Sequence, residues 1–117
     1  MTTTNTSTTA VPMARWWPVI PPGMTRHQAE RLTALACAIR ILGVTAEDTG
    51  WTTRSNRAET AAENLADWLH DAETDDEARI RRYLLLLSAD LTVPGTDTGW
   101  REVRETAKWM IAFARRD

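Results

Sequence analysis

Apolar residues recur every three to four positions along four stretches of the chain, which is the spacing of one face of an α-helix. These stretches cover residues 25–42, 56–72, 75–91 and 99–115. No stretch alternates apolar and polar residues over a useful length, as a half-buried strand would. The pattern therefore predicts an all-α fold, a small four-helix domain that covers residues 25–117.

Capping residues mark the ends of these predicted helices. Thr25 is placed to cap the start of the first helix, and Gly43 is placed to end it. Asn56 stands three residues before Glu59, which is the spacing of a capping box, so we expect the second helix to begin there. Thr74 begins a stronger capping box before the third helix, which Pro94 and Gly95 should end.

A short repeat indicates how the helices pair. The sequence Asp-Thr-Gly-Trp occurs at residues 48–51 and again at residues 97–100, each time between one predicted helix and the next. The repeat favours two helical hairpins, the first helix with the second and the third with the fourth. In each copy we expect Asp or Thr to cap a helix and Trp to close the loop over the core.

Each predicted helix carries an apolar stripe that we expect to face the core. The predicted stripes are Ala29, Leu32, Leu35, Ala36, Ile39 and Leu42 in the first helix, Ala58, Ala61, Ala62, Leu65, Trp68, Leu69 and Ala72 in the second, Ile80, Tyr83, Leu84, Leu87 and Leu91 in the third, and Trp100, Val103, Ala107, Met110, Ile111 and Ala114 in the fourth.

The segment before the helices has a different composition. Residues 1–10 are mostly Thr and Ser without charge, so we expect a disordered tail. Residues 11–24 hold four prolines and the pair Trp16-Trp17, which predicts an extended arm that the tryptophans pin to the domain. No apolar run approaches the roughly 20 residues that span a bilayer, so we expect no membrane partner and a cytoplasmic location.

The composition and the single cysteine exclude several classes of protein and of binding site. The net charge is −2, which counts against a strongly basic nucleic-acid-binding protein. Cys37 is the single cysteine, which excludes an internal disulfide and a zinc site built from several cysteines. It lies beside the apolar stripe with no His or acid in helical reach, so we expect a buried, inert thiol. No nucleophile–base arrangement or phosphate-binding loop is present, which predicts a protein that is not an enzyme and has no cofactor.

Four residues raise the possibility of a metal site. His27 and Glu30 lie three apart in the first helix, and Asp67 and His70 lie three apart in the second. In an antiparallel hairpin His27 is level with His70 and Glu30 with Asp67, as in metal sites built between helices. However, Glu30 and Asp67 project away from the predicted apolar stripes, so we expect both to face water and no metal to bind.

An acidic row runs along the second helix. Glu59, Glu63, Asp67 and Asp71 recur at every fourth position, away from the predicted apolar stripe. Like charges at this spacing destabilise a helix by a few tenths of a kcal/mol per pair, so something should compensate. Neighbouring arginines within the chain are one explanation, and a basic partner is the other.

Four large apolar residues of the third and fourth helices fall outside the predicted stripes, and Ile41 does the same in the first helix. Leu85 and Leu86 belong to the third helix, and Trp109 and Phe113 lie one turn apart in the fourth. Three explanations compete: the other helices surround the third helix, the Trp16-Trp17 arm covers the aromatic pair, or these residues form an interface with a partner or a second copy of the chain.

The sequence as a whole favours a small non-enzymatic protein-interaction module, an inhibitor or adaptor of the kind that phages and mobile elements carry. Its partner would be a protein, with a basic nucleic-acid-binding protein as one class and a homodimer as another. The expected binding residues are Glu59, Glu63, Asp67, Asp71, Leu85, Leu86, Trp109 and Phe113.

Two other classes stay open. The first is a nucleic-acid-binding regulator that would contact phosphates through Arg101, Arg104, Lys108, Arg115 and Arg116. The second is a helical metal-binding protein that would use His27, Glu30, Asp67 and His70.

Overall fold

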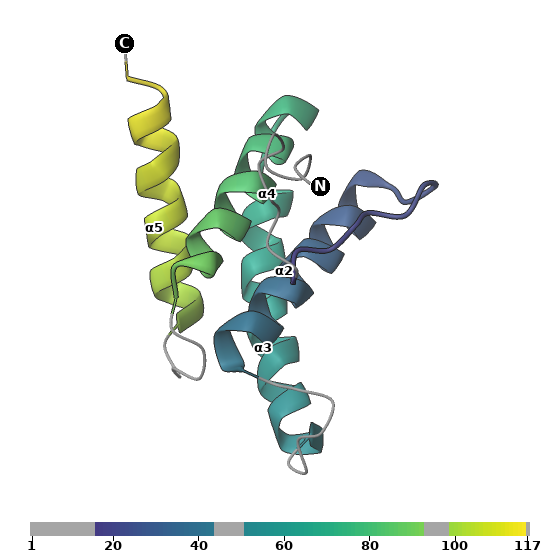
Figure 1. Cartoon of the computed structure of the whole chain (residues 1–117). Helices are drawn as coiled ribbons and strands as arrows, with labels where there is room; N and C mark the ends of the chain where they lie inside the picture. Colours follow the sequence, from purple (N-terminus) through teal and green to yellow (C-terminus); the bar gives the residue numbers. More distant parts are fainter. Residues whose placement is uncertain (1–15, 44–50, 93–98, 117) are drawn as a thin grey trace, which may run out of the picture.

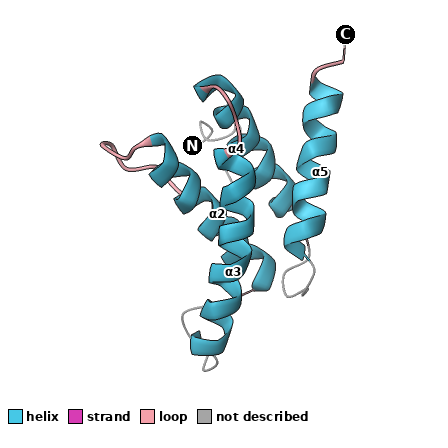
Figure 2. Ribbon diagram, turned by 180° about the vertical axis from the view of Figure 1, so that it is seen from behind, coloured by secondary structure: helices cyan, strands magenta, loops and turns pink. Residues whose placement is uncertain are grey.

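The computed structural model describes residues 16–43, 51–92 and 99–116. It contains the helices α2 (Arg26–Leu42), α3 (Trp51–His70), α4 (Asp75–Asp90) and α5 (Gly99–Ala114), and no strand within the described residues (Figures 1 and 2). The predicted all-α fold of four helices is therefore confirmed. The predicted tail at residues 1–10, the start of the arm at residues 11–15, and Pro94-Gly95 lie outside the described residues.

The predicted ends of α2 are confirmed by their capping geometry. The Thr25 hydroxyl accepts a hydrogen bond from the Gln28 amide at 3.2 Å, and the Gln28 side chain accepts one from the Thr25 amide at 3.0 Å. This reciprocal pair is a capping box, and it satisfies two amides at the helix start. At the other end Gly43 has a φ of 69°, the left-handed conformation that favours glycine after a helix.

The predicted start of α3 is wrong, whereas that of α4 is confirmed. α3 begins at Trp51 rather than Asn56, because no Gly or Pro separates the two positions and a capping box alone does not stop a helix that has already begun. α4 starts where predicted, with the Thr74 hydroxyl accepting from the Glu77 amide at 3.1 Å. The helix α5 begins at Gly99, so both Asp-Thr-Gly-Trp copies run into helix starts.

The helices pack in the predicted pairs. α2 packs mainly on α3, and α4 packs mainly on α5, while a contact between α2 and α4 joins the two pairs (Figure 1). The core contains a few large side chains, such as Leu65, Leu69 and Leu85, together with many small ones. Small residues at the contacts allow helix axes to approach closely. The buried small residues are Ala29, Ala34, Cys37, Ala38, Ala58, Ala61, Ala66, Ala72, Ala78, Ala89 and Ala107.

Two of the four predicted core faces are wrong. α2 buries Ala34, Cys37 and Ile41, nearly opposite the predicted stripe, and it leaves Leu35 exposed. α4 buries Leu85, together with Leu86, Ala78, Ser88 and Ala89, whereas Ile80, Tyr83 and Leu91 are exposed. Both helices are apolar on two sides, and packing selects the side with the small residues because it fits closer helix contacts. The predicted core faces of α3 and α5 largely hold.

The Trp16-Trp17 arm packs on α4 rather than on α5. The Trp17 ring meets Tyr83 edge-on with centroids 5.7 Å apart, and the Trp16 indole N–H donates to Asp90 at 2.9 Å. The explanation that this arm covers Trp109 and Phe113 is therefore wrong.

Within the described residues, none of the helices combines the length and the apolar character that crossing a membrane would require.

Candidate functional site

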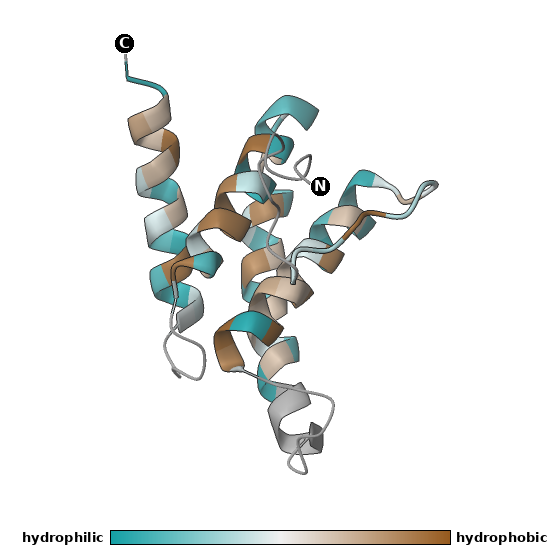
Figure 3. Cartoon of the chain, viewed as in Figure 1, coloured by the Kyte–Doolittle hydropathy of each residue, from teal (hydrophilic) through white to brown (hydrophobic). Residues whose placement is uncertain are grey.

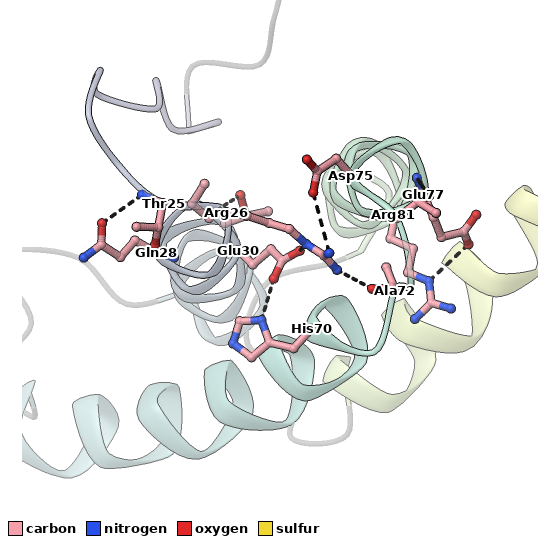
Figure 4. A network of polar contacts seen from close by, with 12 residues as sticks. Thr25, Arg26, Gln28, Glu30, His70, Ala72, Asp75, Glu77 and Arg81 are labelled. Atoms are coloured by element: carbon pink, nitrogen blue, oxygen red, sulfur yellow. Dashed lines mark hydrogen bonds and ion pairs between the residues drawn. The ribbon is translucent and has the colours of Figure 1, made fainter.

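A polar cluster lies where the first turns of α2 meet the end of α3 (Figure 4). Glu30 is completely buried, and its Oε1 lies 2.5 Å from Nδ1 of His70. The His27 ring lies beside the His70 ring, with centroids 4.4 Å apart. The candidate ligand atoms of His27, Glu30 and His70 all lie within 4.8 Å of one another.

Arg26 connects this cluster to α4. Its Nε donates to Oε2 of Glu30 at 2.9 Å, and its guanidinium also donates to the carbonyl of Ala72 in the connection between α3 and α4. An ion pair of 3.7 Å then joins Arg26 to Asp75 at the start of α4 (Figure 4). Both oxygens of the buried Glu30 carboxylate are therefore paired, which a buried charge requires.

The predicted orientation of Glu30 is wrong, and that of Asp67 holds. Glu30 faces inward because the core side of α2 is nearly opposite the predicted one, whereas Asp67 is exposed on α3. His27 and His70 were predicted to lie at the same level of the helical hairpin, and the contact between their rings confirms this. Sequence reasoning missed Arg26, although its spacing of four residues from Glu30 is the spacing of a helical ion pair.

Exposed apolar residues form a second feature on α4 and α5. Trp109 and Phe113 are 59% and 57% exposed, and their rings stack with centroids 5.6 Å apart. Ile80 and Tyr83 of α4 and its C-cap Leu91 are exposed as well. Figure 3 shows the hydrophobic residues that recur along α4. The apolar periodicity assigned these three residues to the core. The small residues on the other side of α4 were the signal that this side is the buried one.

Helical projection places the exposed residues of α4 and α5 on one face of the helix pair. Arg115 of α5 pairs with Glu77, and Arg81, which also pairs with Glu77, donates to the Trp68 carbonyl of α3 at 2.6 Å. That edge of the pair therefore faces α3. At 100° per residue, the exposed side chains of both helices project toward the opposite edge. We call this surface the α4–α5 apolar face; it comprises Ile80, Leu84 and Leu87 of α4 with its C-cap Leu91, and Trp109, Met110 and Phe113 of α5. Tyr83 lies at its border, where Trp17 of the arm packs on it.

The predicted binding role of Leu85 and Leu86 is contradicted. Both side chains are buried in the core cluster, so neither is available to a partner. Trp109 and Phe113 are exposed on the α4–α5 apolar face, where a partner could reach them. The other helices do not surround α4, because only one of its two apolar sides is covered.

The acidic row is exposed along α3, as predicted. Glu59, Glu63, Asp67 and Asp71 all face solvent. Arg31 of α2 is an intramolecular partner of this row: it lies 3.4 Å from Glu63, in a pair whose two side chains are both mostly exposed. An exposed pair of this kind contributes at most about 1 kcal/mol.

Part of the acidic row borders a groove of about 730 Å³ between α2 and α3. The apolar part of its lining comes from Met24, Leu32 and Leu35 of the α2 side and from alanines of α3. Glu59 and Glu63 of the acidic row also line the groove. Arg31 lines the groove as well and pairs with Glu63, so the groove combines an apolar part with charges of both signs.

The basic residues at the C-terminal end do not form an uninterrupted positive surface. Glu105 lies 3.2 Å from both Arg104 and Lys108, and the hydrogen bond from Lys108 holds the pKa of Glu105 below its ordinary value. Arg101 lies over the Trp100 ring, and Arg115 pairs with Glu77. Arg116 lies over the ring of Phe113, with 5.6 Å between its Cζ and the ring centroid.

Cys37 is completely buried, as predicted, and burial raises the pKa of its thiol far above the ordinary value. A thiol in this state is a poor nucleophile.

Comparisons with protein-family models, with curated proteins and with solved structures each find no significant match for this chain.

Proposed function

We propose that this protein is a small non-enzymatic interaction module whose α4–α5 apolar face binds a second copy of the chain. The observation that supports this most is the stacked pair Trp109 and Phe113, with more than half of each side chain exposed. Single exposed apolar residues are ordinary on protein surfaces, but contiguous large ones mark interaction sites. Tryptophan is also among the residues that contribute most to protein interfaces.

The energy available from this face supports a stable contact. An aromatic side chain buries 150–250 Å² when fully covered, so covering the exposed half of one ring removes about 100 Å² from water. At about 25 cal/mol per Å², each ring contributes about 2.5 kcal/mol as an upper value. A symmetric dimer covers each ring twice, once in each copy.

The charges at the two ends of the face are compatible with a second copy. The start of α4 lies beside the end of α5, since Arg115 meets Glu77, and there Arg79, Arg115 and Arg116 are balanced by Asp75, Asp76 and Glu77. At the other end Asp90 and Glu102 make the face negative. A two-fold axis perpendicular to the helices would place the nearly neutral end of one copy on the negative end of the other, and would keep the two negative ends apart.

Such a dimer would leave the acidic rows free for a second contact. The row lies on α3, and the α4–α5 apolar face points away from α3. A basic protein, such as a nucleic-acid-binding protein, would fit this negative surface by charge. The role of inhibitor or adaptor follows from that arrangement and stays a proposal.

Sedimentation equilibrium over a range of protein concentrations tests the dimer. We expect a concentration-dependent dimer, and we expect Trp109→Ser to weaken its dissociation constant at least about 100-fold, since each 1.4 kcal/mol is a factor of ten. Leu35→Ser is the matched control, because Leu35 is an exposed leucine on α2, outside this face. A chain that stays monomeric at high concentration, or a dimer that Trp109→Ser leaves intact, would contradict the proposal.

The alternative of a nucleic-acid-binding regulator has less support, because Glu105 neutralises the middle of its basic series. A gel shift with duplex DNA at low salt separates the two classes. We expect the DNA to run free, and retardation that Arg101→Glu abolishes would favour the regulator instead.

A further inference from the structure

We infer that His27, Glu30 and His70 form a binding site for one divalent transition-metal ion, for which Zn²⁺ is the best fit. The site belongs to α2 and α3 and does not depend on the α4–α5 apolar face. Two imidazoles and one carboxylate are a known zinc ligand set, which leaves the fourth position for water. Their candidate ligand atoms already lie within 4.8 Å of one another.

The helix geometry brings the ligands to one point. His27 and Glu30 are three residues apart on α2, so they lie on the same side of that helix. His70 is the last residue of α3, and its ring lies 4.4 Å from that of His27. The chain has only two histidines, and the structure brings both of them beside one fully buried carboxylate.

The distances suit a metal after small side-chain movements. Ligand atoms about 2.0–2.2 Å from zinc in a tetrahedral site are roughly 3.3 Å from one another. Nδ1 of His70 and Oε1 of Glu30 lie 2.5 Å apart, within hydrogen-bond distance and closer than two ligands of one zinc ion. Zn²⁺ would lie between these two atoms, with the neutral His70 ring carrying its proton on Nε2, while the exposed His27 ring turns inward to complete the site.

The surroundings of Glu30 support the same inference. A carboxylate that binds a metal usually accepts a hydrogen bond on its other oxygen, which fixes its orientation. Arg26 supplies that bond, at 2.9 Å from Oε2 of Glu30. Asp75 lies 3.7 Å from the same guanidinium, so a carboxylate also balances the positive charge of Arg26.

Zinc titration of tag-free protein, followed through the nitrogen-15 signals of the imidazoles, tests the site. Because there are only two histidines, each ring gives its own signals and no other histidine can contribute. We expect one Zn²⁺ per chain and shifts at both rings. We also expect the Co²⁺ form to show visible absorption bands of a four-coordinate site.

Two variants make the test specific. His27→Ala removes an exposed ligand and should leave the fold intact, yet it should weaken zinc affinity at least about tenfold, since even loss of a supporting residue costs 10- to 100-fold. Asp67→Asn is the matched control, because Asp67 is an exposed acid one turn before His70, and it should leave the affinity unchanged. Imidazole signals that zinc does not move, or equal zinc affinity in His27→Ala and the unaltered protein, would overturn the inference.

Discussion

Replacing single leucines of α4 by alanine tests which side of this helix faces the core. Leu85 is fully buried, whereas Leu91 at the end of the helix is 69% exposed. Truncation of a buried leucine to alanine costs about 2–5 kcal/mol, from lost burial and from the cavity that remains. The periodicity of the sequence predicts the reverse order, since it assigns Leu91 to the core and Leu85 to the surface.

The magnitudes follow from the burial of each side chain. For Leu85→Ala we expect a loss of about 3 kcal/mol in the free energy of unfolding, which lowers the melting temperature by about 12–24 °C in a domain of this size. Only about a third of the Leu91 side chain is covered, and full burial of leucine contributes about 1.5–3 kcal/mol, so Leu91→Ala should cost about 0.5–1 kcal/mol.

Urea unfolding followed by far-UV circular dichroism measures both losses. The protein should be dilute, so that self-association does not add to the stability. Leu84→Ala, next in the chain to Leu85 and half-buried, should fall between the two. If Leu91→Ala costs as much as Leu85→Ala, the orientation of α4 is wrong, and the α4–α5 apolar face loses its basis.

Three further outcomes follow from described contacts. Ser88→Ala should cost about 1 kcal/mol in urea unfolding, because the buried Ser88 hydroxyl donates to the Val103 carbonyl at 2.7 Å; no change would contradict this bond. Cys37 should react with a thiol reagent in the folded protein only at the rate of unfolding, and fast labelling would show that it is accessible. Burial raises the pKa of Glu77, but two arginines outweigh it and lower that pKa below its ordinary value. Because its pKa is lowered, the Glu77 carboxylate stabilises the fold at pH values above the unfolded-state pKa, and this contribution is lost as the pH falls through the folded-state pKa. Glu77→Gln should therefore remove part of the loss of stability that thermal unfolding measures between pH 7 and pH 3.

Local signals in the sequence were enough to predict most helix ends and the pairing of the helices. The capping box at Thr25 and the N-cap bond at Thr74 act within one turn, so the sequence alone contains their information. At Thr74 the predicted capping box is only half formed, because the Glu77 side chain pairs with Arg81 and Arg115. The start of α3 was missed because the Asn56–Glu59 pair has the same spacing, although it lies inside a helix. The spacing of a capping box therefore predicts a helix start only where no helix precedes it.

The core faces of α2 and α4 depended on the whole fold. Their buried sides hold small and polar residues, such as Thr33, whose hydroxyl donates to the Ala29 carbonyl at 2.9 Å. A count of large apolar residues selects the other side. Which side is buried depends on how closely neighbouring helices approach, and that is a property of the packed structure.

The candidate metal cluster was predictable only in part. The matching positions of His27 and His70 follow from pairing two antiparallel helices. The inward position of Glu30 does not, because a buried carboxylate is tolerated only where partners reach it. One of these partners, Arg26, comes from the same helix, and the other, His70, comes from 40 residues further along the chain.

Because alanines line the helix contacts, substitutions at these small residues should be tolerated less well than substitutions at some of the large apolar ones. Ala34, Ala38, Ala58 and Ala61 are buried with almost no exposed surface, so larger side chains there would push helices apart. Large outer residues such as Leu35 have space for many replacements. Among natural variants of this chain, variation should therefore be least at its smallest interior residues and greatest at some of its largest apolar ones.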